Sequence, residues 1–254
     1  IAGAVSSGDK GPIDNVWHKE DGRIIKGELK GPPDPGPLPF PDKRLFYEKG
    51  GFSKKGYLIA ASRGCPYYCA YCGHSVYKKL NRETGAPRFR LRSPGSVLAE
   101  LRFAKKAVAP KFVHFTDDVL NSDRRWLQDL MDKYADEIRL PFSCYAFPDL
   151  MDAESARMLA RAGCFKVQMG VQRFDEKKRR ELLARPSSNS AITSAVKALK
   201  AEKIYVTCDS MLGFADETAQ ELDSLLGLLD GCAPDNNEVF FLRYYPGTEL
   251  TARA

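Results

Sequence analysis

The chain has 254 residues, which is enough to bury a sizeable hydrophobic core in one or two domains. Its 43% hydrophobic and 28% charged content excludes a disordered or fibrous chain. The net charge of +6 indicates a mildly basic surface, and without a run of about 18 apolar residues no membrane span is predicted. Its seven cysteines lack the spacing of a disulfide framework, so we expect a cytoplasmic protein.

The first recognisable segment along the chain is rich in proline. Six prolines fall within the ten residues from Pro32 to Pro41, and they exclude a helix or a central strand there. Such a segment predicts a semi-rigid extended linker. We therefore divide the chain into an N-terminal segment and linker, residues 1–45, and a core domain, residues 46–254.

Strand and helix patterns alternate from residue 57 onward. Helices are predicted at 94–107, 122–134, 152–163, 190–201 and 218–229, with Ser93 and Asp152 as N-caps and Gly163 as a stop signal. Strands are predicted at 57–61, 111–116, 142–146, 165–171, 204–212 and 239–244. Strands separated by helices in this way indicate right-handed βαβ units and a parallel sheet, either doubly wound or a partial barrel.

The loop after the first strand holds three cysteines, Cys65, Cys69 and Cys72. Three thiolates at this spacing can surround one small group, and with no obvious fourth cysteine they indicate an iron–sulfur cluster with one open iron. Zinc held by the same cysteines and His74 is the alternative, in a zinc-stabilised nucleic-acid-binding module. Two basic stretches, 77–79 and 88–92, lie near the loop and are suited to steering an anion or an electron donor.

The segment from Ser62 to Cys72 reads Ser-Arg-Gly-Cys-Pro-Tyr-Tyr-Cys-Ala-Tyr-Cys and resembles the signature of the radical S-adenosylmethionine (SAM) superfamily, most of all its cobalamin-linked branch. The resemblance implies a partial (β/α)6 TIM-like barrel of the α/β class, with its site at the C-terminal ends of the strands. It also implies a [4Fe-4S] cluster on the three cysteines, and SAM that is cleaved reductively to a 5′-deoxyadenosyl radical.

Further implications concern the reaction and its partners. The resemblance implies a methyltransferase or a related oxidoreductive enzyme that is reduced by a reductase or by a flavodoxin- or ferredoxin-type donor. The substrate, whether a small molecule, a peptide or RNA, is not indicated, and neither are catalytic residues. A catalytically inactive radical SAM-like protein is a further alternative.

Residues 38–44 resemble the stretch that joins a cobalamin-binding domain to a radical SAM domain. No Asp-x-His-x-x-Gly cobalamin loop is present in the sequence. If cobalamin is used, we expect it to be bound by a domain absent from this chain, with residues 1–45 as the tail of that domain.

Cofactor-binding residues follow from the resemblance and from the strand pattern. The resemblance implies that Tyr71 in the cysteine loop lies against the adenine of SAM, and that Thr116 and Asp117 lie near its methionine moiety. In the fourth strand Gln168 and Gln172 alternate with apolar residues, so they are expected to face the barrel lumen, where an amide can bond a hydroxyl. Asp209 in the fifth strand is expected to face the lumen as well.

Overall fold

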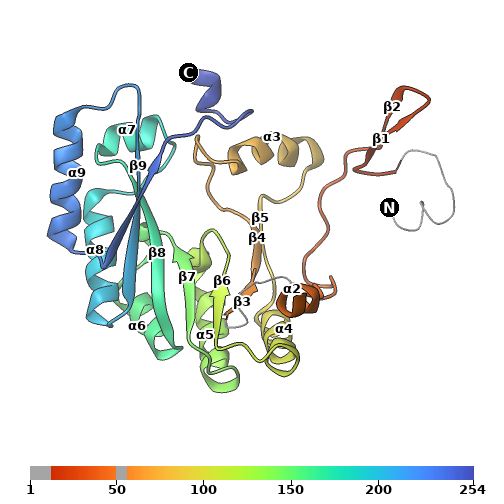
Figure 1. Cartoon of the computed structure of the whole chain (residues 1–254), viewed down its shortest axis with the longest axis horizontal. Helices are drawn as coiled ribbons and strands as arrows, with labels where there is room; N and C mark the ends of the chain where they lie inside the picture. Colours follow the sequence, from red (N-terminus) through yellow and green to blue (C-terminus); the bar gives the residue numbers. More distant parts are fainter. Residues whose placement is uncertain (1–12, 50–55) are drawn as a thin grey trace.

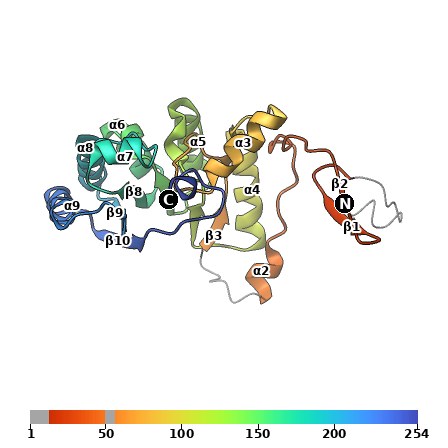
Figure 2. The same ribbon diagram turned by 90° about the horizontal axis from the view of Figure 1, so that it is seen from above.

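The computed structural model describes residues 13–49 and 56–254. Its centre is a six-stranded sheet in the order β10-β9-β8-β7-β6-β3, with every neighbouring pair parallel. The strands are β3 (Gly56–Ile59), β6 (Phe112–Phe115), β7 (Phe142–Ala146), β8 (Cys164–Gln172), β9 (Tyr205–Leu212) and β10 (Asn236–Phe241). The strands follow chain order and form an arc, which confirms the predicted α/β partial barrel (Figures 1 and 2).

Five helices cover one face of this sheet (Figure 2). They are α4 (Pro94–Ala107), α5 (Arg124–Glu137), α6 (Ala153–Arg161), α8 (Asn189–Ala201) and α9 (Ala219–Cys232). At the start of each, a short polar side chain accepts a backbone N–H, and these caps are Ser93, Asp123, Asp152, Ser188 and Thr218. Since the caps satisfy amides that the helix itself leaves unpaired, they fix where each helix begins.

The hydrophobic core lies between the sheet and these helices. Val167, Met169 and Val171 of β8 are fully buried there, so the predicted alternation along this strand is confirmed for the three residues. Phe165, expected on the same face, is 41% exposed and meets Phe112 edge to face at the start of the sheet. The core therefore fills the outer side of the sheet and leaves the polar residues of β8 for the inner side.

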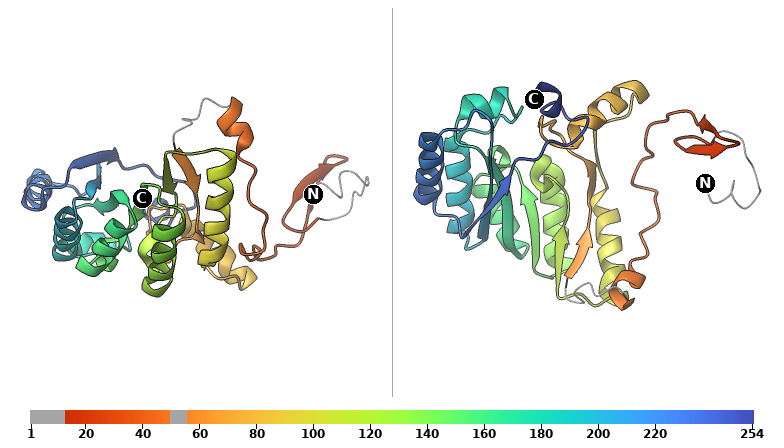
Figure 3. Two further views of the ribbon diagram at one scale, coloured as in Figure 1. Left: turned by 90° about the horizontal axis from the view of Figure 1, so that it is seen from below. Right: turned by 45° about the horizontal axis from the view of Figure 1, so that its top comes forward.

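Several short elements were not predicted. They are the pair β4 (Ser62–Gly64) and β5 (Phe89–Leu91), the helices α2 (Arg44–Lys49), α3 (His74–Thr84) and α7 (Glu176–Glu181), and the 3-10 turns η1 (Leu120–Ser122), η2 (Pro148–Leu150) and η3 (Thr251–Arg253). The hairpin β1 (Trp17–Glu20) and β2 (Arg23–Lys26) lies where residues 16–18 and 21–25 resemble the strands that precede the linker. The C-terminal turn lies beside α3 and α7, at the end of the barrel where the cysteine loop lies (Figure 3).

The N-terminal hairpin stands apart from the barrel, and the proline-rich segment between them has no helix or strand (Figure 1). This segment is attached to the core through Lys43. Its ammonium group donates to Glu100 at 2.9 Å and to the carbonyl of Leu58 at 2.6 Å, and it lies 4.3 Å from the ring centre of Tyr57. The domain boundary at residues 45 and 46 remains a prediction. Among the described residues, no helix combines the length and the apolar character that crossing a membrane requires.

Candidate active site

A cavity of about 170 Å³ lies at the C-terminal ends of β6 to β9. All three cysteines of the loop line it, and so do side chains from the neighbouring strands. The predicted cofactor-binding residues that share this wall are Tyr71, Gln168, Gln172 and Asp209. The structure thus brings together residues that lie up to about 140 positions apart in the sequence, as an α/β barrel does at its strand ends.

Backbone hydrogen bonds fix the cysteine loop on two sides. The amide of Ala70 donates to the carbonyl of Leu183, and the carbonyl of Ala70 accepts from the amide of Leu250, both at 2.9 Å. The ring of Tyr67 stacks on Phe147 with 3.9 Å between the ring centroids. The shape of the loop therefore depends on segments that follow α7 and β10, and not on the loop sequence alone.

A buried guanidinium that the sequence analysis missed reaches the cysteines. Arg185 lines the cavity with 7% of its surface exposed, and its Nη1 lies 3.9 Å from the sulfur of Cys69. Its Nη2 donates to the carbonyl of Gly170 at 2.7 Å, while the group lies 4.4 Å from the ring centre of Phe147. Its Nε has no hydrogen-bond partner. Among the described residues, Arg185 is the only Arg or Lys in the wall of this cavity.

The segment that carries Arg185 is held in place by a second buried arginine. Arg179 is fully buried, and its Nε donates to the carbonyl of Arg173, its Nη1 to the carbonyl of Ser187, and its Nη2 to the carbonyl of Phe174 and to Oδ1 of Asn189. Asp175 caps α7 ahead of it. A run of Arg, Lys and Glu after a strand is typical of a solvated helix, so the sequence carries no clear signal of this buried role.

The end of β8 departs from regular strand geometry. The pairing with β9 shifts register between Gly170 and Gln172, and Gln172 has a φ of +71°. A β-carbon at position 170 would lie 2.1 Å from the side-chain Nε2 of Gln172 and 3.0 Å from Nη2 of Arg185. Glycine at this position therefore leaves the space that both polar side chains occupy.

Three polar side chains meet in the lumen below the cysteine loop. The amide of Gln168 donates to Asp209 at 2.8 Å and to Glu238 at 3.2 Å. The pKa of Asp209 is raised to about 6, mainly by burial and also by the nearby Glu238, while the hydrogen bond from Gln168 opposes the shift. Glu238 was missed because β10 begins at Asn236 rather than at residue 239.

Thr116 and Asp117 do not line the cavity. Asp117 is buried and accepts from the amide of Ala61 at 3.0 Å and from the hydroxyl of Ser62, and Thr116 donates to the carbonyl of Ile59 at 3.2 Å. Both connect the end of β6 to β3 and β4. The next residue, Asp118, lines the cavity instead and lies 2.8 Å from Nε2 of His74.

The thiols of the loop are suited to a metal group that displaces their protons. Burial raises the pKa of Cys65 to about 12 and also raises the pKa of Cys72. A cluster that binds these two thiols must therefore displace their protons. Three thiols and one cation around a single cavity fit a thiolate-ligated iron–sulfur cluster. In the described part of the chain, no three His, Cys, Asp or Glu side chains are placed to hold one metal ion.

The fold and this site together define a parallel (β/α)6 partial barrel with a thiol-lined cavity at its strand ends. The family model of the radical SAM superfamily matches residues 59–229, so the chain belongs to that superfamily. Its members use a [4Fe-4S] cluster and SAM, and the three cysteines stand where the resemblance of the loop expected them.

Individual relatives are distant. An uncharacterised methyltransferase of Pyrococcus horikoshii is 22% identical over 194 residues, which cover 76% of this chain and 40% of that protein. The radical SAM methyltransferase TsrM from Kitasatospora setae, solved with tryptophan and a SAM analogue, superposes with a TM-score of 0.76 and 18% identity, over 98% of this chain and 50% of that one. Another TsrM structure contains cobalamin and a [4Fe-4S] cluster.

The likeness also extends to a radical SAM enzyme with a different reaction. Coproporphyrinogen III oxidase (HemN) from Escherichia coli has a TM-score of 0.60 and 16% identity, over 84% of this chain and 50% of that one. These structures therefore support the fold and not a particular reaction. The chain spans about half the length of the proteins that it matches.

Proposed function

We propose that this chain is the core of a radical SAM enzyme whose cluster is held by Cys65, Cys69 and Cys72. The observation that carries the proposal is the convergence of three thiols, the Arg185 guanidinium and polar lumen residues on one cavity. When bound, the cluster supplies the electron that cleaves SAM to methionine and a 5′-deoxyadenosyl radical. The protein binds SAM, orients it and excludes water.

The residues around the cavity have complementary roles in this proposal. Arg185 offers an unpartnered Nε and a positive charge to the carboxylate of SAM. The hydroxyls of SAM can accept hydrogen bonds from the side-chain amides of Gln168 and Gln172 and can donate to the carboxylate of Asp209. Tyr71 places an aromatic ring at the edge of the same space, where an adenine can stack.

We propose methyl transfer as the reaction. Two of the similar proteins are described as methyltransferases, and TsrM has been solved with cobalamin bound. We propose that cobalamin, if it takes part, is held by a domain outside the described residues, as the sequence around residues 38–44 indicates. All seven cysteines are unpaired, in keeping with the reducing cytoplasm that we propose for the protein.

Anaerobic reconstitution with iron and sulfide tests the proposal. We expect a broad brown absorbance and 5′-deoxyadenosine from SAM with dithionite, both lost in the Cys65→Ala, Cys69→Ala, Cys72→Ala triple variant. Cys232→Ala, at a buried cysteine on α9 outside the cavity, is the matched control and keeps both signals. Full cluster content in the triple variant contradicts the assignment, and one zinc without sulfide supports the zinc alternative.

A further inference from the structure

A second cavity, of about 280 Å³, lies on the other side of the cysteine loop. Cys65 and His74 line both this cavity and the one described above. Its remaining wall is basic and aromatic, with Arg63, Arg88, Arg90, Tyr68 and Tyr77. The two basic stretches, which both follow the cysteines in the sequence, thus meet in space next to the first cysteine of the loop.

The positive charge at this cavity is largely uncompensated. Arg88 is exposed, and no carboxylate of the described residues forms an ion pair with Arg63, Arg88 or Arg90. The guanidinium of Arg63 donates to the carbonyls of Ala60 and Ser62, and that of Arg90 to those of Pro32 and Pro33. Carbonyl oxygens satisfy the donors but leave the net charge in place.

Two acids close to this cavity are already engaged by other cations. Glu249 pairs with Lys78 at 3.0 Å, and Asp118 pairs with His74 at 2.8 Å. Lys78 and Arg88 lie 5.4 and 5.1 Å from the ring centre of Tyr68, so the aromatic face holds two cations near each other. We call Arg63, Arg88 and Arg90 around Tyr68 the basic face, and Lys78, whose charge Glu249 compensates, lies beside it.

The backbone keeps these charges together at an energetic cost. Arg63 of β4 is directly opposite Arg90 of β5, and like charges in that position destabilise a strand pair. Gly64 has a φ of +81°, and a β-carbon there would lie 2.1 Å from the carbonyl oxygen of Arg88. Only glycine permits so close an approach, so the arrangement is built into the hairpin.

We propose that the basic face is the docking site for the acidic surface of a small one-electron carrier protein. This inference rests on the proposed function, because it gives the cysteine loop an electron to receive. The carrier is oxidised by one electron for each SAM cleaved, and neither an atom nor a proton moves with it. Since Cys65 separates the two cavities, the electron arrives from one side while SAM and substrate occupy the other.

Direct binding tests the docking site. The probe is an acidic flavodoxin, titrated against the reconstituted protein at low ionic strength and at about 0.3 M salt, where exposed charges are screened. Arg88→Glu is expected to weaken binding at low salt by roughly tenfold or more and to remove most of the salt dependence. Arg157→Glu, the same charge reversal at an exposed site on α6, is expected to stay within about twofold of the unchanged protein.

Product formation separates this inference from the proposed function. With reduced flavodoxin as donor, Arg88→Glu is expected to lose more 5′-deoxyadenosine formation than with dithionite, which needs no protein contact. If the unchanged protein makes no 5′-deoxyadenosine with dithionite, the proposed function fails, whatever the binding result. Equal affinities for the unchanged protein and Arg88→Glu, or equal losses in both variants, overturn the docking site. A loss of affinity for single-stranded RNA but not for flavodoxin does so too, since it makes the basic face a nucleic-acid surface.

Discussion

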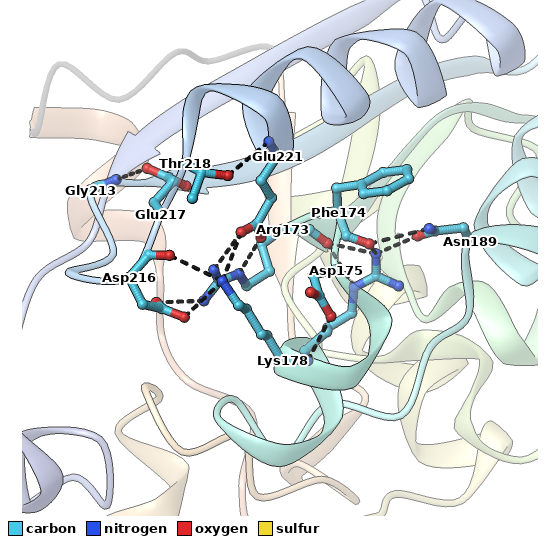
Figure 4. A network of polar contacts seen from close by, with 11 residues as sticks. Arg173, Phe174, Asp175, Lys178, Asn189, Gly213, Asp216, Glu217, Thr218 and Glu221 are labelled. Atoms are coloured by element: carbon cyan, nitrogen blue, oxygen red, sulfur yellow. Dashed lines mark hydrogen bonds and ion pairs between the residues drawn. The ribbon is translucent and has the colours of Figure 1, made fainter.

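Arg173 and Glu221 form a two-bond contact that joins the end of β8 to the first turn of α9. Nε of Arg173 donates to one carboxylate oxygen at 2.6 Å and Nη2 to the other at 2.8 Å (Figure 4). Lys178 and Asp216 extend the contact into a network, and the Arg173 guanidinium lies 4.4 Å from the ring centre of Phe214. This network fixes the start of the segment that carries Arg185.

Replacing Glu221 is therefore expected to be costly. Arg173 is 1% exposed, so Glu221→Ala leaves a buried charge with a single partner, and we expect a loss of about 3 kcal/mol in the free energy of unfolding. Asp129→Ala, which breaks the exposed pair with Lys133, is expected to cost about 0.5 kcal/mol or less. Urea unfolding of both variants measures this, and equal losses would show that the network adds no stability.

Replacing glycine by alanine is expected to have opposite effects on stability at positions 64 and 227. Gly64→Ala places a β-carbon against the Arg88 carbonyl at positive φ, and we expect it to destabilise the protein by about 2 kcal/mol or more. Gly227 lies inside α9 with nothing within 4 Å of a β-carbon, so Gly227→Ala is expected to stabilise by about 0.5–1 kcal/mol. Thermal unfolding gives both signs, and a neutral Gly64→Ala would contradict the close approach.

The raised pKa of Asp209 predicts a pH dependence of stability. Because the folded state holds this proton up to about pH 6 and the unfolded chain only to about pH 4, stability due to this group is lost as the pH rises between them. Asp209→Asn removes that loss, and we expect a gain of roughly 1–2 kcal/mol at pH 8, allowing for solvent screening of the carboxylate. The gain should vanish below about pH 4. If Asp209→Asn raised the free energy of unfolding equally at both pH values, the gain would have a cause other than the proton of Asp209.

Arg185 is expected to strengthen SAM binding at some cost in the free energy of unfolding. It is buried beside thiols, and no carboxylate of the described residues pairs with it, so Arg185→Met should be at least as stable as the unchanged protein before SAM is added. Loss of one charge-assisted contact predicts SAM binding weaker by about tenfold or more, partly restored in Arg185→Lys. Equilibrium binding and urea unfolding separate the two effects, and a destabilised variant with unchanged SAM affinity would make the role structural.

The regular parts of the barrel could be predicted because their signals are local. Ser93 and Asp152 mark helix starts, and the buried runs of β7 and β8 carry clear patterns. The segment of α3 has no sustained apolar stripe, and β4 and β5 are three residues each, so neither stands out in the sequence. β10 lies at the sheet edge with most of its apolar residues exposed, which blurred its start.

The site was predicted where the chemistry resides in one segment and missed where it depends on packing. The spacing of the cysteines is visible in the sequence. Which of the two adjacent carboxylates faces the cavity is not, because it depends on how the backbone turns after β6. Asp118 faces the cavity, whereas Asp117 accepts from the amide of Ala61. Arg185 directly follows Leu182, Leu183 and Ala184, and nothing in that stretch of sequence indicates a buried guanidinium beside Cys69.

The glycine at position 170 has a consequence for how the protein can adapt. Since main chain rather than a side chain forms that part of the β8 wall, substitution there can only narrow the cavity and never widen it. A larger open space beside this cavity shares Tyr71 and Cys72 with it and is lined by the exchangeable side chains of Met211, Phe240 and Tyr245. A variant library aimed at new ligands should therefore leave β8 untouched and diversify the ends of β9 and β10.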